Sequence, residues 1–453
     1  MEFSCATRKS DLEKLDGKEF DVLVVGGGIV GAGITNILSA NGLRILLVDK
    51  GDFASGTSSN SSKLIHGGLR YLAQGHLLLT RELLKERNYL LNNLDFVKKM
   101  KFDILIDDGS WSRSSLYFGL FLYNLLGGKF KLPHFQTEGY SYPGFKGKFT
   151  YEDASTDDAL LVIHNVVSSV IQGSTAINYL EASAFKDKDE KVETELIDRF
   201  GNGTYKVTSK IVVNASGPWV NVAYRDYTSR RIENMRLSKG SHIIFKRDKF
   251  GLNNAVAFRS HLDRRQMFII PKGEVVIVGT TDRFIDNPGD SEMSEEERNY
   301  ILNSVRKIVP SLDQQEILGS YSGIRPLYGS GDDPGRVTRD FHIDITGKMI
   351  SIVGVKITNY RAASRKICKQ IGKMLQTNIR VTDLPKIVYK RGNEDPLESA
   401  LMKECALTVE DVLKRRLGCY YNKEDQGKPQ VKSIEDRISK LNNQCKKRTE
   451  SIL

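Results

Sequence analysis

The sequence contains no apolar run of the ~18 residues that a membrane-spanning helix needs, and it is poor in cysteine. Residues 1–18 are polar and charged, which is not typical of a signal peptide. The five cysteines are scattered, without a Cys-x-x-Cys pair or the spacing of metal ligands; they are Cys5, Cys368, Cys405, Cys419 and Cys445. We therefore expect free thiols in a reducing compartment and no metal site.

The sequence also lacks the runs of Lys and Arg with interleaved aromatic residues that are typical of nucleic-acid modules. Its formal net charge is nevertheless +11, which leaves an anionic membrane surface or anionic small molecules as partners. The aromatic-rich segment Leu116–Leu126 is most simply interpreted as a buried helix. The alternative is a segment that contacts a membrane interface. The length of 453 residues suggests two or three domains.

A glycine-rich turn between two apolar segments is the most informative feature that is present. The run Asp21–Val25 and a second run that ends at Asp49 are typical of parallel strands buried on both faces. Between them, Gly26, Gly28 and Gly31 form a Gly-x-Gly-x-x-Gly pattern that leads into a helical repeat. The glycines allow a tight turn, the approach of a pyrophosphate and close helix packing, while the aspartate accepts from ribose hydroxyls. The unit predicts a bound dinucleotide.

Apolar periodicity predicts further helices and strands along the chain. The expected helices cover residues 76–96, 163–171, 294–309 and 358–375. The expected strands cover residues 204–213, 242–245, 267–270, 275–278 and 349–353, the third and fourth forming a hairpin. Ser294 is the expected N-cap of its helix. Residues from 384 onward are expected to form a helical part, with 423–451 as a solvated face or tail.

A set of ordered motifs resembles the FAD-dependent glycerol-3-phosphate dehydrogenase family, in its aerobic, respiratory form. The motifs are the glycine turn and Thr57–Tyr71, Val213–Val220, Lys239–Ile243, Gly279–Asp282, Tyr321–Leu327 and Thr338–Asp340. The match spans about residues 20–361, and Leu407–Arg416 is similar to the helical domain of the family. Several motifs in the same order make coincidence improbable.

The resemblance implies an α/β fold with three parts: a Rossmann-like FAD-binding domain, a β-rich substrate domain and a C-terminal helical domain. The FAD-binding domain is expected to comprise residues 20–80, 145–225 and 340–378. The substrate domain is expected to comprise residues 81–144 and 226–339, and the helical domain residues 384–453.

The resemblance also implies a tightly held FAD. The implied cofactor-binding residues are Gly26, Gly28, Gly31, Asp49, Ser58, Ser59, Ser62, Lys63, His66, Ala215, Gly217, Gly354, Lys356 and Thr358. Covalent attachment at His66 is chemically possible, but the resemblance argues against it. We therefore expect non-covalent FAD.

The implied reaction is oxidation of sn-glycerol 3-phosphate to dihydroxyacetone phosphate, with the C2 hydride passing to flavin N5. Oxidising a secondary alcohol needs a hydride acceptor, a base for the hydroxyl proton and positive charge for the developing alkoxide. His242 is the candidate base, because imidazole titrates near ~6.5, and a merely packed histidine is the alternative. The candidate catalytic residues are His242, Arg325 and Lys356, and the candidate substrate-binding residues are Arg70, Thr281 and Arg339. Lys356 is implied near either the phosphate or the flavin N1–O2 edge.

Two positions depart from the family pattern Gly-Gly-Lys-x-Thr-Thr-Tyr-Arg. Val355 replaces a glycine and Asn359 replaces a threonine, where the chain is expected to pass the flavin ring. A side chain at 355 puts flavin reactivity and the electron acceptor in question. A glycerol-3-phosphate oxidase that makes peroxide is therefore the close alternative, and a catalytically silent flavin-binding protein or an amine or amino-acid oxidase is a more distant one.

The resemblance further implies that electrons pass to membrane quinone. The protein is then expected in the cytoplasm, bound peripherally to the inner face of the cell membrane, with no nucleic-acid partner. A homo-oligomer is compatible with the sequence.

Overall fold

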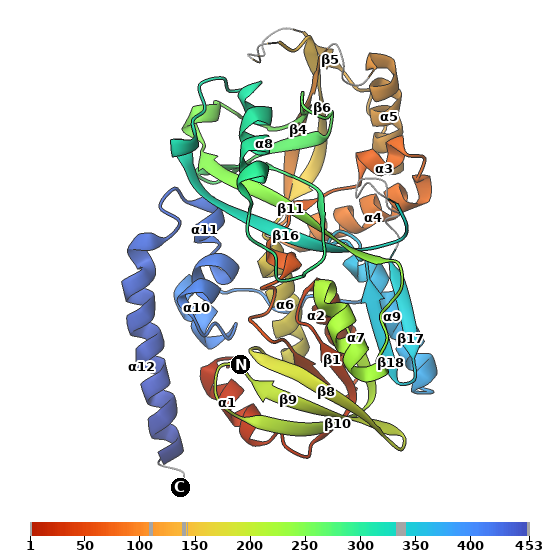
Figure 1. Ribbon diagram of the computed structural model, residues 1–453, viewed down its shortest axis with the longest axis vertical. Coiled ribbons are helices and arrows are strands. Elements are labelled where there is room, and N and C mark those ends of the chain that lie inside the picture. The colour runs from red at the N-terminus through yellow and green to blue at the C-terminus, as the bar shows by residue number, and fades with distance from the viewer. Residues whose placement is uncertain (1, 108–111, 138–141, 143, 332–340, 451–453) are drawn as a thin grey trace.

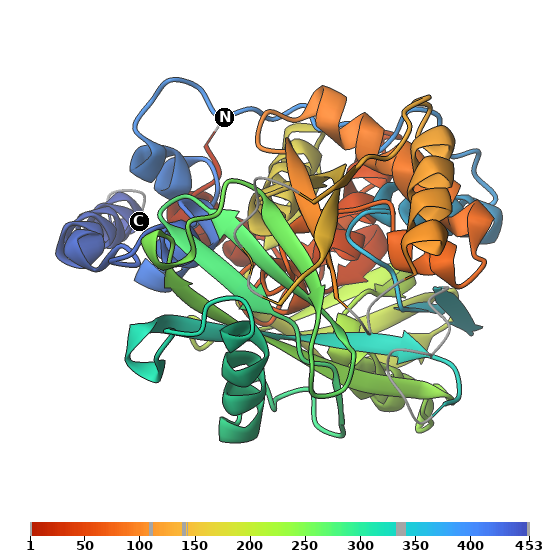
Figure 2. The ribbon, with the colours of Figure 1, turned by 90° about the horizontal axis from the view of Figure 1, so that it is seen from above.

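The computed structural model describes residues 2–107, 112–137, 142, 144–331 and 341–450, with side chains through residue 443. Two β-sheets lie one above the other in Figure 1, and a group of C-terminal helices runs along one side of the lower sheet. In Figure 2, helix α5 (Arg113–Leu126) and helix α12 (Val431–Glu450) lie on opposite sides of the molecule. No helix in the described part is long and apolar enough to cross a bilayer.

The first sheet is built around the glycine-rich unit. Its strand order is β17–β18–β10–β1–β2–β7, and β18, β10, β1, β2 and β7 run parallel. Val22 and Val24 of β1 pack against α2, α6 and α9, whereas Leu23 and Val25 face β8–β10 and α7. Both faces of β1 are therefore buried, which explains its continuous apolar run. The strands are β1 (Glu19–Val25), β2 (Ile45–Val48), β7 (Thr175–Ile177), β8 (Leu180–Lys188), β9 (Lys191–Asp198), β10 (Thr204–Asn214), β17 (His342–Thr346) and β18 (Met349–Val353).

The second sheet supplies the other wall of the site. Its central strands follow the order β15–β11–β14–β13–β12–β4–β6–β3, with β16 paired to β11 and β5 to β6. The long antiparallel pair β11–β16 places His242 opposite Tyr321 and Ser238 opposite Arg325. The strands are β3 (Leu64–Ile65), β4 (Lys98–Ile106), β5 (Phe135–Gln136), β6 (Gly147–Ser155), β11 (Met235–Lys246), β12 (Ala255–Arg259), β13 (Gln266–Lys272), β14 (Val275–Gly279), β15 (Arg283–Ile285) and β16 (Ile317–Tyr328).

Helices cover both sheets and form the C-terminal part. The remaining helices are α1 (Cys5–Glu13), α2 (Ile29–Ser39), α3 (Leu69–Ala73), α4 (Leu77–Asn93), α6 (Asp158–Ile171), α7 (Val220–Thr228), α8 (Glu295–Arg306), α9 (Tyr360–Met374), α10 (Pro396–Met402) and α11 (Cys419–Asn422). Short helical turns complete the chain at residues 57–59, 217–219, 248–250, 314–316, 411–416 and 428–430.

The α/β fold with a Rossmann-like first sheet is confirmed, and every helix and strand expected from periodicity is present. The hairpin β13–β14 pairs Lys272 with Val275. Ser294 caps α8 as expected: its hydroxyl accepts from Glu297 N, and the Glu297 carboxylate accepts from Ser294 N. The division into three domains stays a prediction, and two strands from the ranges expected for the FAD-binding domain, β3 and β6, pair within the second sheet.

Two segments differ in detail from the expectation. In α5, Leu116, Leu120 and Tyr123 are buried, but Phe118 is 68% and Leu125 is 50% exposed, so the helix is half core and half surface. The charged stretch expected as a solvated face or tail contains all of α12, in which apolar residues recur at helical spacing and Ile434 is fully buried.

The C-terminal helices are joined to the first sheet by buried charges. Asp52, in the loop after β2, accepts from Arg415 Nε at 2.7 Å and from both terminal nitrogens of Arg416 at 2.8 and 2.9 Å. The Arg416 side chain is fully buried and also donates to the carbonyl of Glu404. Such groups are stable in an interior only when their charges and hydrogen bonds are matched, as they are here.

Candidate cofactor and substrate site

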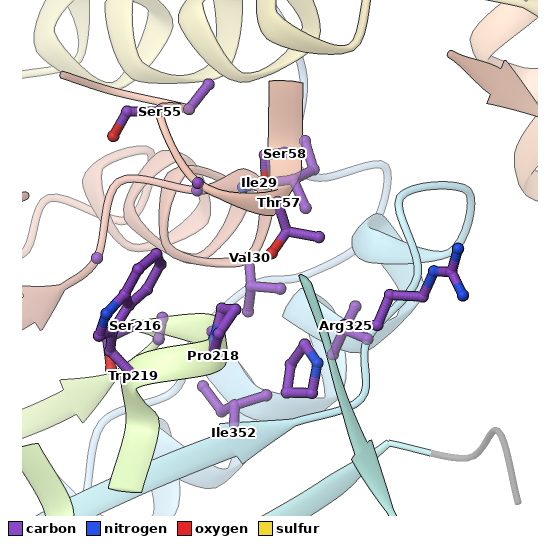
Figure 3. Close-up of a pocket in the computed structure, with 18 of the residues that line it drawn as sticks. Ile29, Val30, Ser55, Thr57, Ser58, Ser216, Pro218, Trp219, Arg325 and Ile352 are labelled. Atoms are coloured by element: carbon purple, nitrogen blue, oxygen red, sulfur yellow. Dashed lines mark hydrogen bonds between the residues drawn. The ribbon is translucent and has the colours of Figure 1, made fainter. Parts of the chain in front are cut away.

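A cavity of about 830 Å³ lies where the two sheets meet. Its walls come from the β1–α2 turn, the loops between β2 and β3, the turn after β10, the end of β16 and the loop between β18 and α9. Figure 3 shows Ser58 beside Ile29 at the start of α2, Pro218 and Trp219 on the wall after β10, and Arg325 on β16. The cavity therefore joins the dinucleotide turn to the second sheet.

The glycines of the turn are required by close backbone contacts. Gly26 has φ +105°, and a Cβ on it would lie 2.6 Å from the Ala215 carbonyl oxygen. A Cβ on Gly31 would lie 1.9 Å from the Gly26 carbonyl oxygen, which explains how α2 packs so closely on β1. Gly28 is the N-cap of α2 and lines the cavity, so the positive end of the helix faces it.

Asp49 follows β2 directly and lines this cavity. Its carboxylate accepts from Gly27 N at 2.7 Å and from Gly51 N at 2.9 Å. Burial raises the pKa of Asp49 to about 6, with Asp52 adding to the rise, because desolvation outweighs the two backbone donors. A ribose hydroxyl would supply a further donor to this carboxylate, as the sequence predicts.

The loop before β3 divides into residues that face the cavity and residues that hold the loop from behind. Ser58, Ser62 and His66 line the cavity, and Ser58 Oγ accepts from Ile29 N at 3.0 Å. Lys63 differs from the prediction, because its ammonium points into the protein and donates to Asp158 Oδ1 at 2.7 Å and to the carbonyl of Ser59 at 2.8 Å. The Ser59 side chain is likewise buried outside the cavity lining.

The loop between β18 and α9 supplies the opposite wall. Gly354, Lys356 and Thr358 line the cavity, and Thr358 Oγ1 accepts from His66 N at 3.2 Å. Lys356 Nζ lies 5.2 Å from the centroid of the Tyr71 ring, which also lines the cavity. Ala215 and Gly217 complete the wall after β10. These contacts bring segments far apart in the chain to one surface.

His242 lies on β11 and is only 2% exposed. Its Nε2 is 2.9 Å from Ser62 Oγ, and its ring stacks on Tyr321 with a centroid distance of 4.8 Å and an interplanar angle of 10°. Nδ1 is buried without a hydrogen-bond partner in the described part of the chain. Burial, then Arg325 and Lys63, lower the pKa of His242 to about 3, so the imidazole is neutral at pH 7.

Arg325 projects from β16 into the same cavity. Its guanidinium donates to Asp282 Oδ1 at 3.0 Å and to Thr280 Oγ1 at 3.3 Å. Gly240 gives it room, because a Cβ there would lie 2.0 Å from the guanidinium. Sequence reasoning did not single out Asp282 as the residue that orients this arginine, although it ends the Gly-Thr-Thr-Asp motif.

The predicted substrate-binding residues lie in different places. Thr281 is buried away from the cavity, where its hydroxyl donates to Glu297 Oε1 at 2.9 Å and accepts from Ser241 N at 2.9 Å. Arg70 is an exposed residue of α3 outside the cavity lining. Arg339 lies outside the described residues. The substrate-binding roles of Thr281, Arg70 and Arg339 stay predictions.

The structure shows where the two residues that depart from the family pattern lie. Val355 lines the cavity, so its side chain narrows the space beside the loop. Asn359 is buried, and its Oδ1 accepts from Lys356 N at 3.3 Å while its Nδ2 donates to Glu82 Oε1 at 3.0 Å. Asparagine here ties the loop that carries Lys356 to α4.

The cavity residues fit a dinucleotide on their own geometry. A glycine cradle that a Cβ would fill, a helix N-terminus and an acid at the end of β2 occur in one continuous wall. Beyond this wall, the cavity is lined by His242 and Arg325. These two residues lie on the paired strands β11 and β16. In the described part of the chain, no group of three His, Cys, Asp or Glu side chains is arranged to hold a metal ion.

Comparisons with known proteins agree with this geometry. Residues 21–347 match the model of the FAD dependent oxidoreductase family, DAO. An aerobic glycerol-3-phosphate dehydrogenase of Staphylococcus aureus is 35% identical over 405 residues, which cover 85% of this chain and 72% of that protein.

Two solved structures share the fold. The glycerol-3-phosphate dehydrogenase of Bacillus halodurans in complex with FAD aligns with a TM-score of 0.77 at 24% identity, covering 99% of this chain and 97% of that one. The L-alpha-glycerophosphate oxidase of Mycoplasma pneumoniae with FAD bound aligns with a TM-score of 0.62 at 18% identity, covering 82% and 97%. The family match and the Staphylococcus relative lead to one conclusion: the chain belongs to the FAD-dependent oxidoreductases and, among them, to the aerobic glycerol-3-phosphate dehydrogenase family.

Proposed function

We propose that this protein is an FAD-dependent enzyme that oxidises sn-glycerol 3-phosphate to dihydroxyacetone phosphate. The observation that carries the proposal is the junction of a dinucleotide cradle with a buried neutral histidine and an oriented arginine in one cavity. The family membership supports the cofactor and the substrate. When bound, FAD supplies the acceptor for the C2 hydride.

The side chains of the second sheet then perform the proton chemistry. His242 is neutral and takes the proton of the C2 hydroxyl, and its ring is held by Ser62 and Tyr321 during the transfer. Arg325, fixed by Asp282, stabilises the negative charge that develops on the substrate oxygen. The proton and the charge are therefore handled by two residues of one strand pair.

The substrate phosphate requires cations that can approach it. Lys356 lines the cavity on the wall opposite β16, and we propose that it contacts either the phosphate or the flavin N1–O2 edge. Arg339 is proposed to contribute a bidentate contact to the phosphate. Glycerol without its phosphate is then expected to be a very poor substrate.

We further propose quinone as the electron acceptor and the inner face of the cell membrane as the place of action, with self-association into a homo-oligomer as a further expectation. A surface around α5 supports membrane contact: Phe118, Leu125, Phe130 and Leu132 are exposed by 68, 50, 81 and 59%. The sequence between Asp108 and Glu138 contains basic residues and no acidic one, which suits an anionic lipid surface.

The buried face of α5 contacts the loop that carries His66. Tyr123, on the buried face of α5, accepts a hydrogen bond from Gly67 N at 2.9 Å and donates to Asp153 Oδ2 at 2.7 Å. Gly67 immediately follows His66, which lines the cavity. The helix that carries this surface therefore also holds the loop that carries His66.

Anaerobic mixing of the purified holoenzyme with glycerol 3-phosphate tests the function, with flavin absorbance near ~450 nm as the readout. Rapid bleaching by glycerol 3-phosphate, and little with glycerol, is the expected result. Persistent colour with glycerol 3-phosphate would contradict the proposal. Rapid stoichiometric peroxide formation on exposure to air would favour the oxidase alternative over quinone.

A further inference from the structure

An aromatic stack connects His242 with the C-terminal helices. Tyr321 lies flat against the imidazole, and Tyr421 of α11 packs edge-on against Tyr321 with a centroid distance of 5.1 Å. Tyr321 and Tyr421 are 8% and 3% exposed, and neither lines the cavity. They form a second layer behind the histidine.

A buried cation fixes the far end of this stack. The ammonium of Lys63 lies 3.7 Å from the centroid of the Tyr421 ring and 5.6 Å from that of Tyr321. The same ammonium is paired with the carboxylate of Asp158, which is fully buried. Both rings therefore meet a positive charge whose position is set by an ion pair.

The hydroxyls of the stack hold the cofactor loop. Tyr321 donates to the carbonyl of Ser61 at 3.0 Å, and Tyr421 donates to Asn60 Oδ1 at 3.3 Å. The next residue, Ser62, contacts the imidazole through its hydroxyl. The loop is thus held between the stack on one side and His242 on the other.

The helix that carries Tyr421 is itself held on several sides. Just before it, Arg415 and Arg416 bind Asp52. At its end, the carbonyl of Asn422 accepts from Glu274 N at 2.9 Å, so α11 also contacts the β13–β14 hairpin. The ring of Tyr421 therefore has a defined place that it cannot leave without disturbing these contacts.

We propose that Tyr421 is a positioning residue for the oxidation, which closes the aromatic stack behind His242 and so makes the C-terminal helices part of the active-site framework. The inference rests on the proposed function, because it assigns His242 the role of base. It acts through Tyr321, Lys63 and the cofactor loop, without contact to the substrate.

Replacement of the ring tests the proposal in the full-length holoenzyme. Tyr421→Leu is expected to lower kcat with glycerol 3-phosphate and a soluble acceptor by about tenfold or more, while KM stays within about threefold, because substrate contacts are unchanged. Tyr421→Phe keeps the contacts of the ring with Tyr321 and Lys63 but loses the hydrogen bond to Asn60, so its activity is expected to lie between those of the wild type and Tyr421→Leu. Tyr389→Leu is the matched control, since Tyr389 is a buried tyrosine of the C-terminal part that donates to Glu404 and lies outside the stack.

The pH profile separates positioning from loss of stability. The charged and titratable groups around the imidazole are Arg325, Tyr321, Lys63, Asp158 and Tyr421. Loss of the Tyr421 ring admits water behind the stack, which relieves the desolvation of His242, so the acidic limb of kcat/KM moves to higher pH. Tyr389→Leu is expected to leave that limb in place.

The outcomes are distinct. If Tyr421→Leu reproduces the kcat and the pH profile of Tyr389→Leu per folded, FAD-loaded molecule, the proposal is overturned. If the unmutated holoenzyme does not oxidise glycerol 3-phosphate, the proposed function fails, and with it the inference. A tenfold loss in Tyr421→Leu with an upward shift of the acidic limb supports it.

Discussion

At His242, burial and two neighbouring cations act in the same direction. They lower the pKa of the imidazole to about 3, so the side chain is uncharged throughout the neutral range. A general base works only in its neutral form, so kcat/KM is expected to fall as the pH decreases through the pKa of this residue. The acidic limb should therefore lie below pH ~6.5, the value of an unperturbed histidine, because kcat/KM reports the pKa of the free enzyme.

His242→Asn removes the base and keeps a polar side chain of similar size. We expect kcat to fall by about 10²–10⁴, as is usual for loss of a general base, and the acidic limb to disappear. The measurement is the pH dependence of kcat/KM for both proteins. A wild-type limb centred above pH ~6.5, or a variant that keeps the limb, would contradict the role of this residue.

Val355 offers a second experiment on a single side chain. Its isopropyl group lines the cavity where the family pattern has glycine. Val355→Gly is expected to widen access to the flavin and to increase the rate of reoxidation by oxygen severalfold, measured as peroxide produced per reduced enzyme. Val30→Ala, another valine of the cavity wall, is the control for a general loss of packing. Equal rates in the wild-type protein and Val355→Gly would show that this position does not govern oxygen access.

Among the contacts that join different elements, the ion pairs of Asp52 are expected to contribute most to the stability of the fold. Burial alone would raise the pKa of this carboxyl, but Arg416 and Arg415 outweigh it and hold the pKa below its usual value. Asp52→Asn removes the carboxylate that Arg416 binds with two nitrogens and one of the two buried carboxylates of Arg415, which keeps Asp411, and this is expected to cost about 3–5 kcal/mol. The measurement is chemical or thermal unfolding of the holoenzyme.

The lowered pKa of Asp52 also predicts how the stability of the protein depends on pH. Because the folded-state pKa is depressed, the stabilisation is present above the unfolded-state value of ~3.9 and is lost as the pH falls below it. The wild-type protein should therefore lose stability below about pH 4 more steeply than Asp52→Asn. Arg437→Ala removes an exposed ion pair of α12 and should change stability by less than about 1 kcal/mol.

The elements of the dinucleotide unit were predictable because their signals are local. Apolar runs of four to seven residues, glycines at fixed offsets and a helix cap such as Ser294 depend on neighbours within one turn or strand. The direction of Lys63 was not predictable. Its ammonium is held by Asp158, 95 positions away, and no local pattern carries that information.

The same reason explains the differences in the site. Thr281 reads as a polar residue of a ligand-binding motif, but its partner Glu297 lies on a helix that the motif does not contain. His242, Arg325 and Lys356 were recognised through the family motifs, and the structure brings them to one cavity. Tyr321 begins one of these motifs, but the packing of Tyr421 against it depends on contact between the second sheet and α11 and leaves no signature in the sequence.

For the molecule as a whole, the α5 surface predicts an orientation on a membrane. Wild-type protein is expected to bind vesicles that contain phosphatidylserine, and to bind more weakly as salt increases, because part of the attraction is electrostatic. Replacement of Phe118, Leu125 and Phe130 by serine should weaken binding by at least about tenfold, since burying each such side chain contributes roughly 1.5–3 kcal/mol. Co-sedimentation with the vesicles measures this.

Two exposed apolar residues elsewhere provide the control. Phe200 and Ile345 are 45% and 43% exposed and lie near the first sheet, so Phe200→Ser with Ile345→Ser should leave vesicle binding unchanged. Turnover with a soluble acceptor should be equal in all three proteins. Unchanged vesicle binding by the α5 variant, or a change in oligomeric state instead, would rule out this surface as the membrane contact.

The ion pair between Asp52 and Arg416 joins residues 364 positions apart, and this separation has a consequence for biosynthesis. At roughly 5–20 residues per second, the ribosome completes Arg416 roughly 20–70 seconds after Asp52. During that time the nascent dinucleotide unit has all its strands in reach but lacks the cations that neutralise its buried aspartate. Formation of this buried contact therefore waits for Arg416, and a polypeptide that ends before it would leave Asp52 without the cations that hold its pKa low.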